Sequence, residues 1–253
     1  MSLTVALVQH ASGLDPADNR ALLADLTPGG VDLAVFPEAF AHDFGEAGSD
    51  VAPYAEPLDG PFAGEVARVA DERGTSVLAG MFEASDDPTR PWNTLVLRGA
   101  ARADYRKVHL YDSFGYRESD RLAAGPISAC TASLGGFTLG LQTCYDLRFP
   151  EQSRALVDAG ADVLVVPAAW VAGERKVDHW RTLVRARAIE NTAYVVAVGQ
   201  PAPRYSGHSM VVDPLGDVVA EAGEGEEVLT AVLDPERVVE ARRTNPSLLN
   251  RRR

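Results

Sequence analysis

Residues 32–40 read Asp-Leu-Ala-Val-Phe-Pro-Glu-Ala-Phe, and residues 162–170 read Asp-Val-Leu-Val-Val-Pro-Ala-Ala-Trp. In each stretch a short apolar run ends at a proline, which predicts a buried strand that stops there and presents the next side chains at its end. The similarity indicates two comparable halves, each with strands covered by helices. Two sheets packed face to face with helices outside would bury both faces of each sheet. The two stretches therefore favour an α/β fold of two packed sheets with helices outside.

Short β-rich runs alternate with longer amphipathic stretches along the rest of the chain. No linker or low-complexity segment divides it, so residues 1–253 are expected to form a single domain. Residues 110–136 are expected to be a loop. Helices are predicted at 19–26, 62–72, 150–160 and 176–191, with a last one starting at Asp234-Pro235, and strands at 3–8, 32–36, 76–82, 94–98, 103–109, 137–143, 162–166, 194–198, 209–212, 217–220 and 228–233.

The composition narrows the class of protein. A formal net charge of -12 disfavours binding to phosphate backbones, and the terminal Arg251-Arg252-Arg253 is expected to be a solvated tail, so no nucleic-acid partner is predicted. Two cysteines are too few for a disulfide framework, and no metal-ligand spacing occurs. Residues 1–6 show no targeting segment, and no apolar run is long enough for a membrane span. A cytoplasmic, reduced protein without a metal is expected.

Cys144 is the candidate nucleophile. It ends an apolar strand and precedes Tyr-Asp-Leu-Arg-Phe, which leads into a helix at Pro150. A nucleophile at such a turn faces a cleft, where backbone N–H groups can stabilise negative charge and the same field is expected to lower the thiol pKa. A small buried core cysteine is the other interpretation. Cys130 lacks these flanks and is expected to be inert.

Glu38, Lys107 and Glu118 are the other candidate catalytic residues. Glu38 follows an apolar strand, so its carboxylate can be a general base in a partly dry cleft or a solvated strand end. Strand alternation places Lys107 on one face with Tyr105 and His109. Its ammonium could stabilise an oxyanion there, or it could be an edge-strand lysine that discourages aggregation. Nothing local distinguishes Glu118 from an ordinary loop acid.

Other chemistries have weaker support. Any of the five histidines could pair with Cys144, but none has flanks typical of a cysteine protease. Residues 135–140 are glycine-rich but precede a strand rather than open a helix, so they do not form a phosphate-binding loop. No cofactor is therefore expected.

Five segments in chain order form a family pattern, and they cover nearly the whole chain: Phe36-Pro-Glu38-Ala-Phe40, Tyr105-Arg-Lys107-Val-His-Leu-Tyr-Asp112, Leu141-Gln-Thr-Cys144-Tyr-Asp-Leu-Arg-Phe-Pro-Glu151, Arg185-Ala-Arg-Ala-Ile-Glu-Asn191 and Gly207-His-Ser-Met-Val-Val-Asp-Pro-Leu-Gly216. In these segments the chain resembles the nitrilase superfamily of carbon–nitrogen hydrolases. The resemblance implies an α-β-β-α sandwich. It also implies that Glu38, Lys107 and Cys144 are the family's Glu-Lys-Cys triad and that Glu118 is the second glutamate, which orients the lysine.

The chemistry implied is a two-step acyl transfer through a thioester, in which Glu38 moves the protons and the backbone N–H of Tyr145 helps to hold the oxyanion. The segments most resemble the amidase branch, which hydrolyses ω-amides of dicarboxylates and deaminated glutathione, so a small-molecule amide is the expected partner. Arg148 could meet a substrate carboxylate or pair with Glu151. Trp170 could wall the pocket or be a core residue.

The resemblance also implies a homodimer formed through helices like 150–159 and 176–191. A nitrilase and an N-carbamoyl amine amidohydrolase remain alternatives on the same fold. A catalytically silent scaffold that acts through its dimer surface is an alternative of another class. A papain-like protease is the alternative with the least support.

Overall fold

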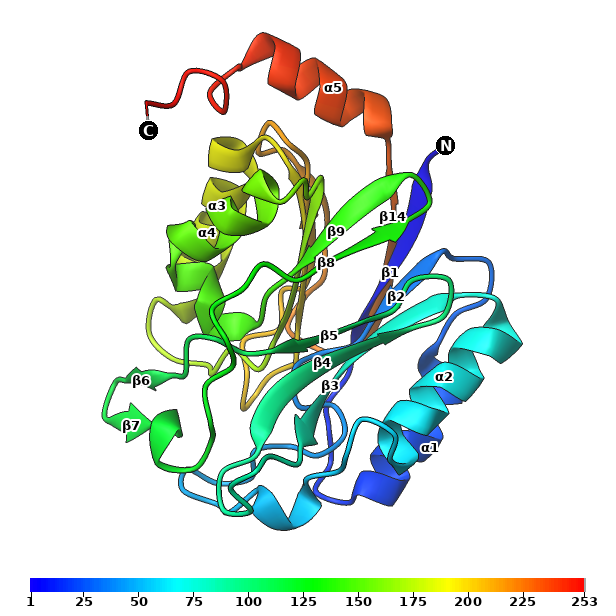
Figure 1. Ribbon diagram of the computed structural model, residues 1–253, viewed down its shortest axis with the longest axis vertical. Helices are drawn as coiled ribbons and strands as arrows, with labels where there is room; N and C mark the ends of the chain where they lie inside the picture. Colours follow the sequence, from blue (N-terminus) through cyan, green and yellow to red (C-terminus); the bar gives the residue numbers. More distant parts are fainter. Residues whose placement is uncertain (253) are drawn as a thin grey trace.

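The computed structural model describes residues 1–252, whose strands form two six-stranded sheets that face each other (Figure 1). The first sheet has the order β14-β1-β2-β3-β4-β5, and the second has the order β13-β12-β11-β10-β9-β8. The strands of the first are β1 Leu3–Gln9, β2 Leu33–Val35, β3 Ser76–Glu83, β4 Trp92–Arg98, β5 Ala103–Arg106 and β14 Glu227–Leu233. Those of the second are β8 Thr131–Leu134, β9 Phe137–Leu141, β10 Val163–Ala168, β11 Tyr194–Gly199, β12 Met210–Val212 and β13 Val218–Glu221.

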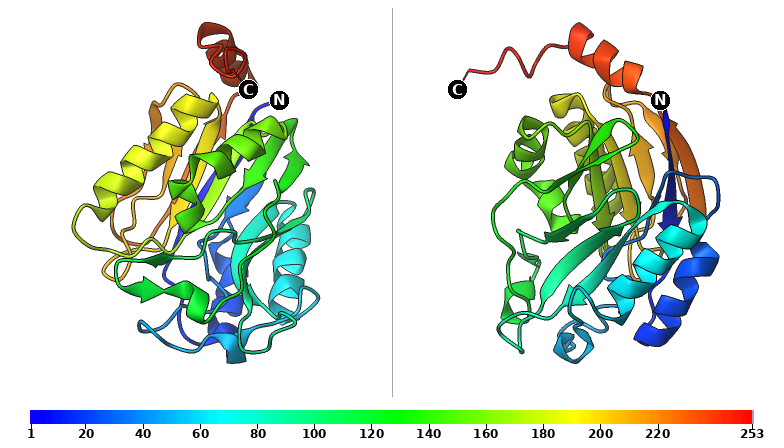
Figure 2. Two further views of the ribbon diagram at one scale, coloured as in Figure 1. Left: turned by 60° about the vertical axis from the view of Figure 1, so that its left-hand side comes forward. Right: turned by 45° about the vertical axis from the view of Figure 1, so that its right-hand side comes forward.

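The helices cover the outer faces of the two sheets. One pair packs on the first sheet and another on the second, and Figure 2 shows the pairs on opposite sides of the molecule. The first sheet is covered by α1 Pro16–Leu26 and α2 Pro61–Arg73, and the second by α3 Pro150–Asp158 and α4 Lys176–Asn191. The prediction of four α-β-β-α layers is confirmed. A fifth helix, α5 Pro235–Thr244, follows β14 at the end of the molecule near the N-terminus (Figure 1).

A dry apolar layer joins the two sheets. Leu7 and Val35 of the first sheet belong to the same buried cluster as Val165 and Val196 of the second, and all four are fully buried. Burial of one such side chain contributes about 1.5–3 kcal/mol. Because both sheets depend on this shared layer, the described residues form one domain.

The two similar stretches of sequence occupy equivalent places. β2 lies between β1 and β3, and β10 lies between β9 and β11, in both cases with parallel neighbours. A strand with parallel neighbours on both sides is covered on both faces, which explains its continuous apolar run.

Local signals explain both ends of α2 and the start of α5. Pro61 opens α2, and Gly74 ends it in the left-handed conformation with φ 63°. The Asp234 side chain accepts a hydrogen bond from the Glu236 N–H at 3.0 Å and so caps α5.

Several predicted boundaries were wrong. The strand expected to stop at Pro167 continues through it to Ala168, and α1 begins at Pro16 rather than at residue 19. The strand expected at 103–109 ends at Arg106, although the Lys107 N–H still donates to the Asn93 carbonyl at 2.8 Å. The stretch expected to be a loop contains β8, which pairs with β9, and a small hairpin of β6 Asp112–Ser113 and β7 Tyr116–Arg117. These strands are short and mostly polar, so they carry little periodic signal.

The basic end of the chain is partly paired. Arg251 forms an ion pair with Asp158 of α3, which corrects the expectation of a fully solvated tail, while Arg252 is exposed and Arg253 lies outside the described residues. Within residues 1–252, the helices are too short or too polar to cross a bilayer.

Candidate active site

A cavity of about 400 Å³ opens where β2 and β10 end, and all four candidate catalytic side chains line it. Three of them come from the first half of the chain and one from the second, so the fold brings together residues that are up to 106 positions apart. The others that line it are Phe44, Gly45, Glu46, Ala47, Tyr111, Phe114, Tyr116, Tyr145, Arg148, Ala169, Trp170, Val171, Ala172, Lys176, Arg204 and Tyr205.

Glu38 lies just beyond β2 and is only 1% exposed. Its Oε2 accepts a hydrogen bond from the Ala169 N–H at 2.6 Å, and Ala169 directly follows β10. The ends of the two equivalent strands therefore meet at this carboxylate. The Glu38 carbonyl accepts from Gln200 Nε2 at 3.0 Å, which ties the same segment to the end of β11.

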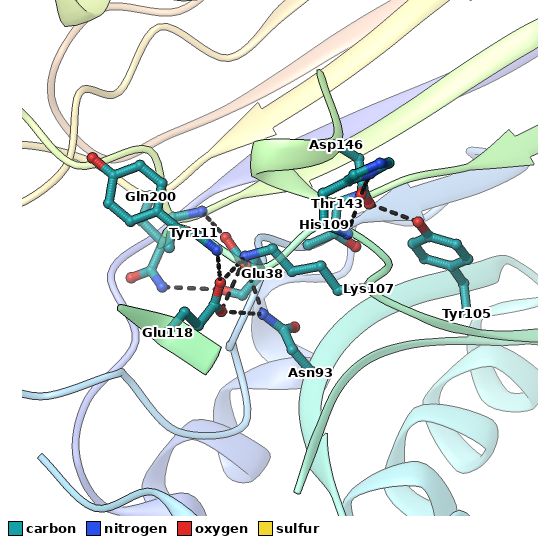
Figure 3. A network of polar contacts seen from close by, with 11 residues as sticks. Glu38, Asn93, Tyr105, Lys107, His109, Tyr111, Glu118, Thr143, Asp146 and Gln200 are labelled. Atoms are coloured by element: carbon teal, nitrogen blue, oxygen red, sulfur yellow. Dashed lines mark hydrogen bonds and ion pairs between the residues drawn. The ribbon is translucent and has the colours of Figure 1, made fainter. Parts of the chain in front are cut away.

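Lys107 lies just beyond β5 and is held between two carboxylates (Figure 3). Its Nζ is 2.9 Å from Glu38 Oε1, 2.9 Å from Glu118 Oε2 and 3.1 Å from Glu118 Oε1. Burial alone would lower the pKa of this ammonium, but Glu118 and Glu38 outweigh burial and raise the pKa well above its ordinary value. Lys107 is thus a fixed cation at the cavity wall.

Glu118 follows the β6–β7 hairpin at the start of a short 3₁₀ turn, Glu118–Asp120, and is 2% exposed. Besides Lys107, its Oε2 accepts from the Tyr111 N–H at 2.5 Å, so the base of the hairpin holds the carboxylate. Burial raises the pKa of Glu118, Lys107 opposes this rise and Glu38 adds to it.

Cys144 begins the 3₁₀ turn Cys144–Arg148 after β9, with φ 45° and 7% exposure. A non-glycine residue with positive φ is strained, and such strain is typical of residues held for function. The expected lowering of the thiol pKa was wrong. Burial and the Glu38 carboxylate raise the pKa of Cys144 well above its ordinary value, and Lys107 only partly opposes them.

The carboxylate of Asp146 stabilises the turn that carries the thiol. Buried completely, it accepts from the Tyr105 hydroxyl at 2.6 Å, from the Thr143 N–H at 2.9 Å and from the His109 N–H at 2.9 Å (Figure 3). His109 Nδ1 also contacts this carboxylate and lies 2.8 Å from Asp146 Oδ1. Tyr105 and His109 lie on either side of Lys107 in sequence. One segment therefore carries the Lys107 cation and contacts the turn that begins at Cys144.

The three candidate substrate-binding residues all line the cavity. Tyr145 packs edge-on against Tyr111, with ring centroids 5.0 Å apart. Arg148 lies with its Cζ 4.7 Å from the Trp170 ring centroid, and its buried Nε and Nη2 have no hydrogen-bond partner among the described residues. The alternative pairing of Arg148 with Glu151 is not among the ion pairs of residues 1–252.

Sequence reasoning missed two polar residues of the site. Asn93 in β4 is fully buried beside the carboxylates of Glu38 and Glu118, and a polar residue inside an apolar strand is the signal that could have found it. Lys176, at the start of α4, donates from Nζ to the Tyr111 hydroxyl at 3.0 Å and lies 4.0 Å from the Phe114 ring centroid. Burial and then Arg148 lower the pKa of Lys176. No local pattern marks this lysine as a cavity residue.

The histidines lie outside the cavity. No histidine of the described chain lines the cavity. Within residues 1–252, no group of three or more His, Cys, Asp or Glu side chains is arranged to hold a metal ion.

Comparisons with known proteins agree with this architecture. Residues 4–243 match the family model described as carbon-nitrogen hydrolase. A hydrolase of Mycobacterium tuberculosis is 38% identical over 95% of this chain and 92% of its own length. The deaminated glutathione amidase of Escherichia coli O157:H7 is 41% identical over 91% of this chain and 88% of its own. The human protein of that name is 37% identical over 98% and 82%.

Solved structures show the same fold. A CN-hydrolase superfamily protein from Xanthomonas campestris, solved with an arsenic adduct in its active site, has a TM-score of 0.89 at 30% identity, covering 100% of this chain and 98% of that chain. An amidase from Nesterenkonia sp. has a TM-score of 0.81 at 28% identity, covering 98% and 96%. This chain belongs to the carbon–nitrogen hydrolase family of the nitrilase superfamily, and it is a hydrolase of carbon–nitrogen bonds other than peptide bonds.

Proposed function

We propose that this chain hydrolyses a small non-peptide carboxamide to a carboxylic acid and ammonia, through a thioester on Cys144. One observation carries the proposal: a buried ammonium, Lys107, is fixed between two buried carboxylates in the cavity that the Cys144 thiol lines. Such a set supplies a nucleophile, a proton acceptor and a cation for an oxyanion.

The first step is acylation. Because the pKa of Cys144 is raised, its thiol is protonated at neutral pH and needs a base in contact with it. Glu38, which lines the same cavity and raises the pKa of this thiol, takes its proton as the sulfur attacks the amide carbon. Lys107 and the backbone N–H of Tyr145 stabilise the oxyanion, and loss of one such donor costs about 2.7–4 kcal/mol in other hydrolases.

The second step is release of the acid. Glu38 gives the proton to the departing nitrogen, ammonia leaves, and the sulfur remains bound to the acyl carbon. Glu38 then takes a proton from water, whose oxygen attacks the thioester, and returns that proton to the sulfur as the bond breaks. Glu118 keeps Lys107 charged and aimed through both steps, as its two hydrogen bonds to Nζ support.

The substrate class follows from the outer part of the cavity. Arg148 has two buried N–H donors without a partner, and Lys176 lies beside it with a single hydroxyl contact. A half-buried guanidinium with two buried, unpartnered donors suits a carboxylate, which it can bind in a bidentate manner. Relatives named deaminated glutathione amidase support an amide that carries a carboxylate. Trp170, stacked on Arg148, would form the wall of this subsite.

The proposal is tested by measuring ammonia and free acid from matched substrates. The panel contains a dicarboxylate monoamide, a neutral aliphatic amide, the corresponding nitrile and an N-carbamoyl amine. We expect the monoamide to be hydrolysed fastest. Preference for the nitrile or the carbamoyl compound would establish one of the two alternative reactions on this fold.

The nucleophile is tested with Cys144→Ala, with Cys130→Ala as the matched control. Intact-protein mass spectrometry during turnover is expected to detect an acyl adduct in the wild type and in Cys130→Ala but not in Cys144→Ala. A Cys144→Ala protein that keeps more than a residual rate would reject the thioester. A wild type that hydrolyses nothing in the panel would favour the silent scaffold, and cleavage of peptides would favour a protease.

We further propose that the protein is a cytoplasmic homodimer. The outer faces of α3 and α4 form one side of the molecule (Figure 1), and Ile189 of α4 is exposed there. Sedimentation of the purified protein tests the assembly, and a monomer at micromolar concentration would reject it.

A further inference from the structure

We propose that Asn93 is a positioning residue for the hydrolysis: its amide keeps the Glu38 carboxylate ionised and leaves one carboxylate oxygen for the thiol proton. This inference rests on the proposed function, because it assumes that Glu38 is the base. It concerns a residue outside the Glu-Lys-Cys pattern.

The contacts of Asn93 join three of the four candidate catalytic residues (Figure 3). Its Nδ2 donates to Glu38 Oε1 at 2.7 Å and lies 3.5 Å from Glu118 Oε1. Its main-chain carbonyl accepts from the Lys107 N–H at 2.8 Å. Asn93 is fully buried and does not line the cavity, so it acts through these residues and not on substrate.

The two oxygens of Glu38 differ in how many donors they receive. Oε1 accepts from Lys107 Nζ at 2.9 Å and from Asn93 Nδ2 at 2.7 Å, which occupies both of its lone pairs. Among residues 1–252, the one donor to Oε2 is the Ala169 N–H, so one lone pair stays available. The proton that leaves the Cys144 sulfur therefore goes to Oε2, and it leaves from the same oxygen when the product nitrogen is protonated.

The balance of charge explains why a neutral donor is needed. Two almost fully buried carboxylates share one buried ammonium, so one negative charge lacks a cation. A hydrogen bond to the charged form of an acid favours that form. The Asn93 amide supplies such a hydrogen bond to Glu38 without adding charge. Its Oδ1 is buried with no partner, so the donor side alone accounts for a polar residue at this place in β4.

The titratable groups that face Glu38 are Lys107, Glu118, Cys144 and Tyr205. Burial lowers the pKa of the Lys107 ammonium, but the two carboxylates outweigh burial and raise it. Burial raises the pKa of the Cys144 thiol and of the Tyr205 hydroxyl. These three groups titrate on the alkaline side. The acid limb of the pH profile therefore reports the carboxylate pair, as a coupled unit.

The test is the pH dependence of kcat and KM for Asn93→Ala. Loss of one hydrogen bond to a charged group is expected to move the acid limb of kcat/KM upward by about one pH unit. We expect kcat to fall about 10–100-fold and KM to stay within about twofold, because Asn93 does not contact substrate.

Thr94→Val is the matched control. Thr94 is the next residue of β4 and is equally buried, and its Oγ1 donates to another buried carboxylate, that of Glu83, at 2.8 Å. Thr94→Val therefore removes a hydrogen bond from a buried side chain to a buried carboxylate, as Asn93→Ala does, but outside the site. We expect the acid limb to be unchanged in this variant.

An acid limb that does not move in folded Asn93→Ala would overturn the inference, even if kcat falls, because a merely structural loss would not change the pH profile. Thermal melting verifies folding. If Asn93→Ala does not melt cooperatively, Asn93→Leu, which preserves volume, is measured with the same expected shift. Wild-type activity that survives Cys144→Ala would instead contradict the proposed function, so the two failures are distinguishable.

Discussion

Replacing Glu118 by glutamine would remove one charge beside the buried lysine while leaving the size of the side chain unchanged. Both Glu118 oxygens contact Lys107 Nζ, at 2.9 and 3.1 Å. At an effective dielectric constant of about 20, two unit charges at roughly 3 Å interact by about 5 kcal/mol. Glu38 still contacts the ammonium and the lost carboxylate no longer needs desolvation, so we take about 3 kcal/mol as the net loss. That loss corresponds to about two pH units in the titration of Lys107.

The sign follows from which form of the lysine is active. In the proposed mechanism the charged ammonium stabilises the oxyanion. In the wild type the two carboxylates raise the pKa of Lys107 well above 10.5 despite the lowering effect of burial. Activity should therefore persist through pH 10. In Glu118→Gln the carboxylate that counteracted burial is gone, and burial still lowers the pKa of Lys107. The alkaline limb of the activity profile should therefore move down by about two pH units.

The assay is ammonia release between pH 6 and pH 10.5. We expect Glu118→Gln to lose about tenfold in kcat at pH 7, where the ammonium remains. The loss should grow toward pH 10, with the roughly 100-fold to 1,000-fold effect of a removed oxyanion donor as its limit. Asp120→Asn is the control, because this acid is two residues away, exposed, and paired with Arg117 at 3.5 Å. An alkaline limb that is the same in Glu118→Gln and wild type would refute the role assigned to this carboxylate.

Three further predictions follow from individual contacts. Gly80→Ala should reduce kcat at least tenfold and lower the stability by about 1–3 kcal/mol, because an added Cβ would lie 2.8 Å from the Glu38 Cα. Gly64→Ala is the control, since a Cβ added there meets nothing within 4 Å. Equal kcat values for the two variants would contradict this prediction. Arg148→Met should raise KM for an anionic amide about 10–100-fold and leave a neutral amide unaffected; equal effects on both substrates would exclude a carboxylate subsite. Because burial raises the pKa of Cys144, the folded protein retains a thiol proton that the unfolded chain loses above about pH 8.5. The stability of the wild type should therefore fall above this pH by about 1.4 kcal/mol per pH unit relative to Cys144→Ala. If urea denaturation gives the two proteins the same change in stability between pH 8.5 and 10, the raised pKa is contradicted.

The sequence predicted those parts of the fold whose signal is local. Residues 32–40 and 162–170 each carry an apolar run stopped by proline, and they proved to be equivalent strands whose ends meet where the Ala169 N–H donates to Glu38. The long helix 176–191 was predicted with both boundaries correct. A buried strand and an amphipathic helix impose their period on the residues themselves, so one sequence suffices.

The electrostatics of the site could not be predicted in the same way. The turn at Cys144 indicated backbone dipoles that lower a thiol pKa, but burial and the carboxylate of Glu38, which comes from the other sheet, outweigh them. Desolvation depends on everything packed around the group, and none of it is written in the flanking residues. The possible pair of Arg148 with Glu151 failed for a similar reason, because the tertiary fold aims the guanidinium into the cavity instead.

The raised pKa of the thiol has a consequence for the proposed chemistry. A preformed thiolate would need a partner to supply the proton for the leaving nitrogen, and the cavity has no histidine for this task. A thiol that is still protonated brings that proton itself: Glu38 takes it as the sulfur attacks and returns it as ammonia departs. The proton then stays between Cys144, Glu38 and the leaving nitrogen throughout acylation, and Lys107 remains a constant cation. On this reasoning, burial of Cys144 serves the reaction by making proton transfer to Glu38 part of the nucleophilic attack.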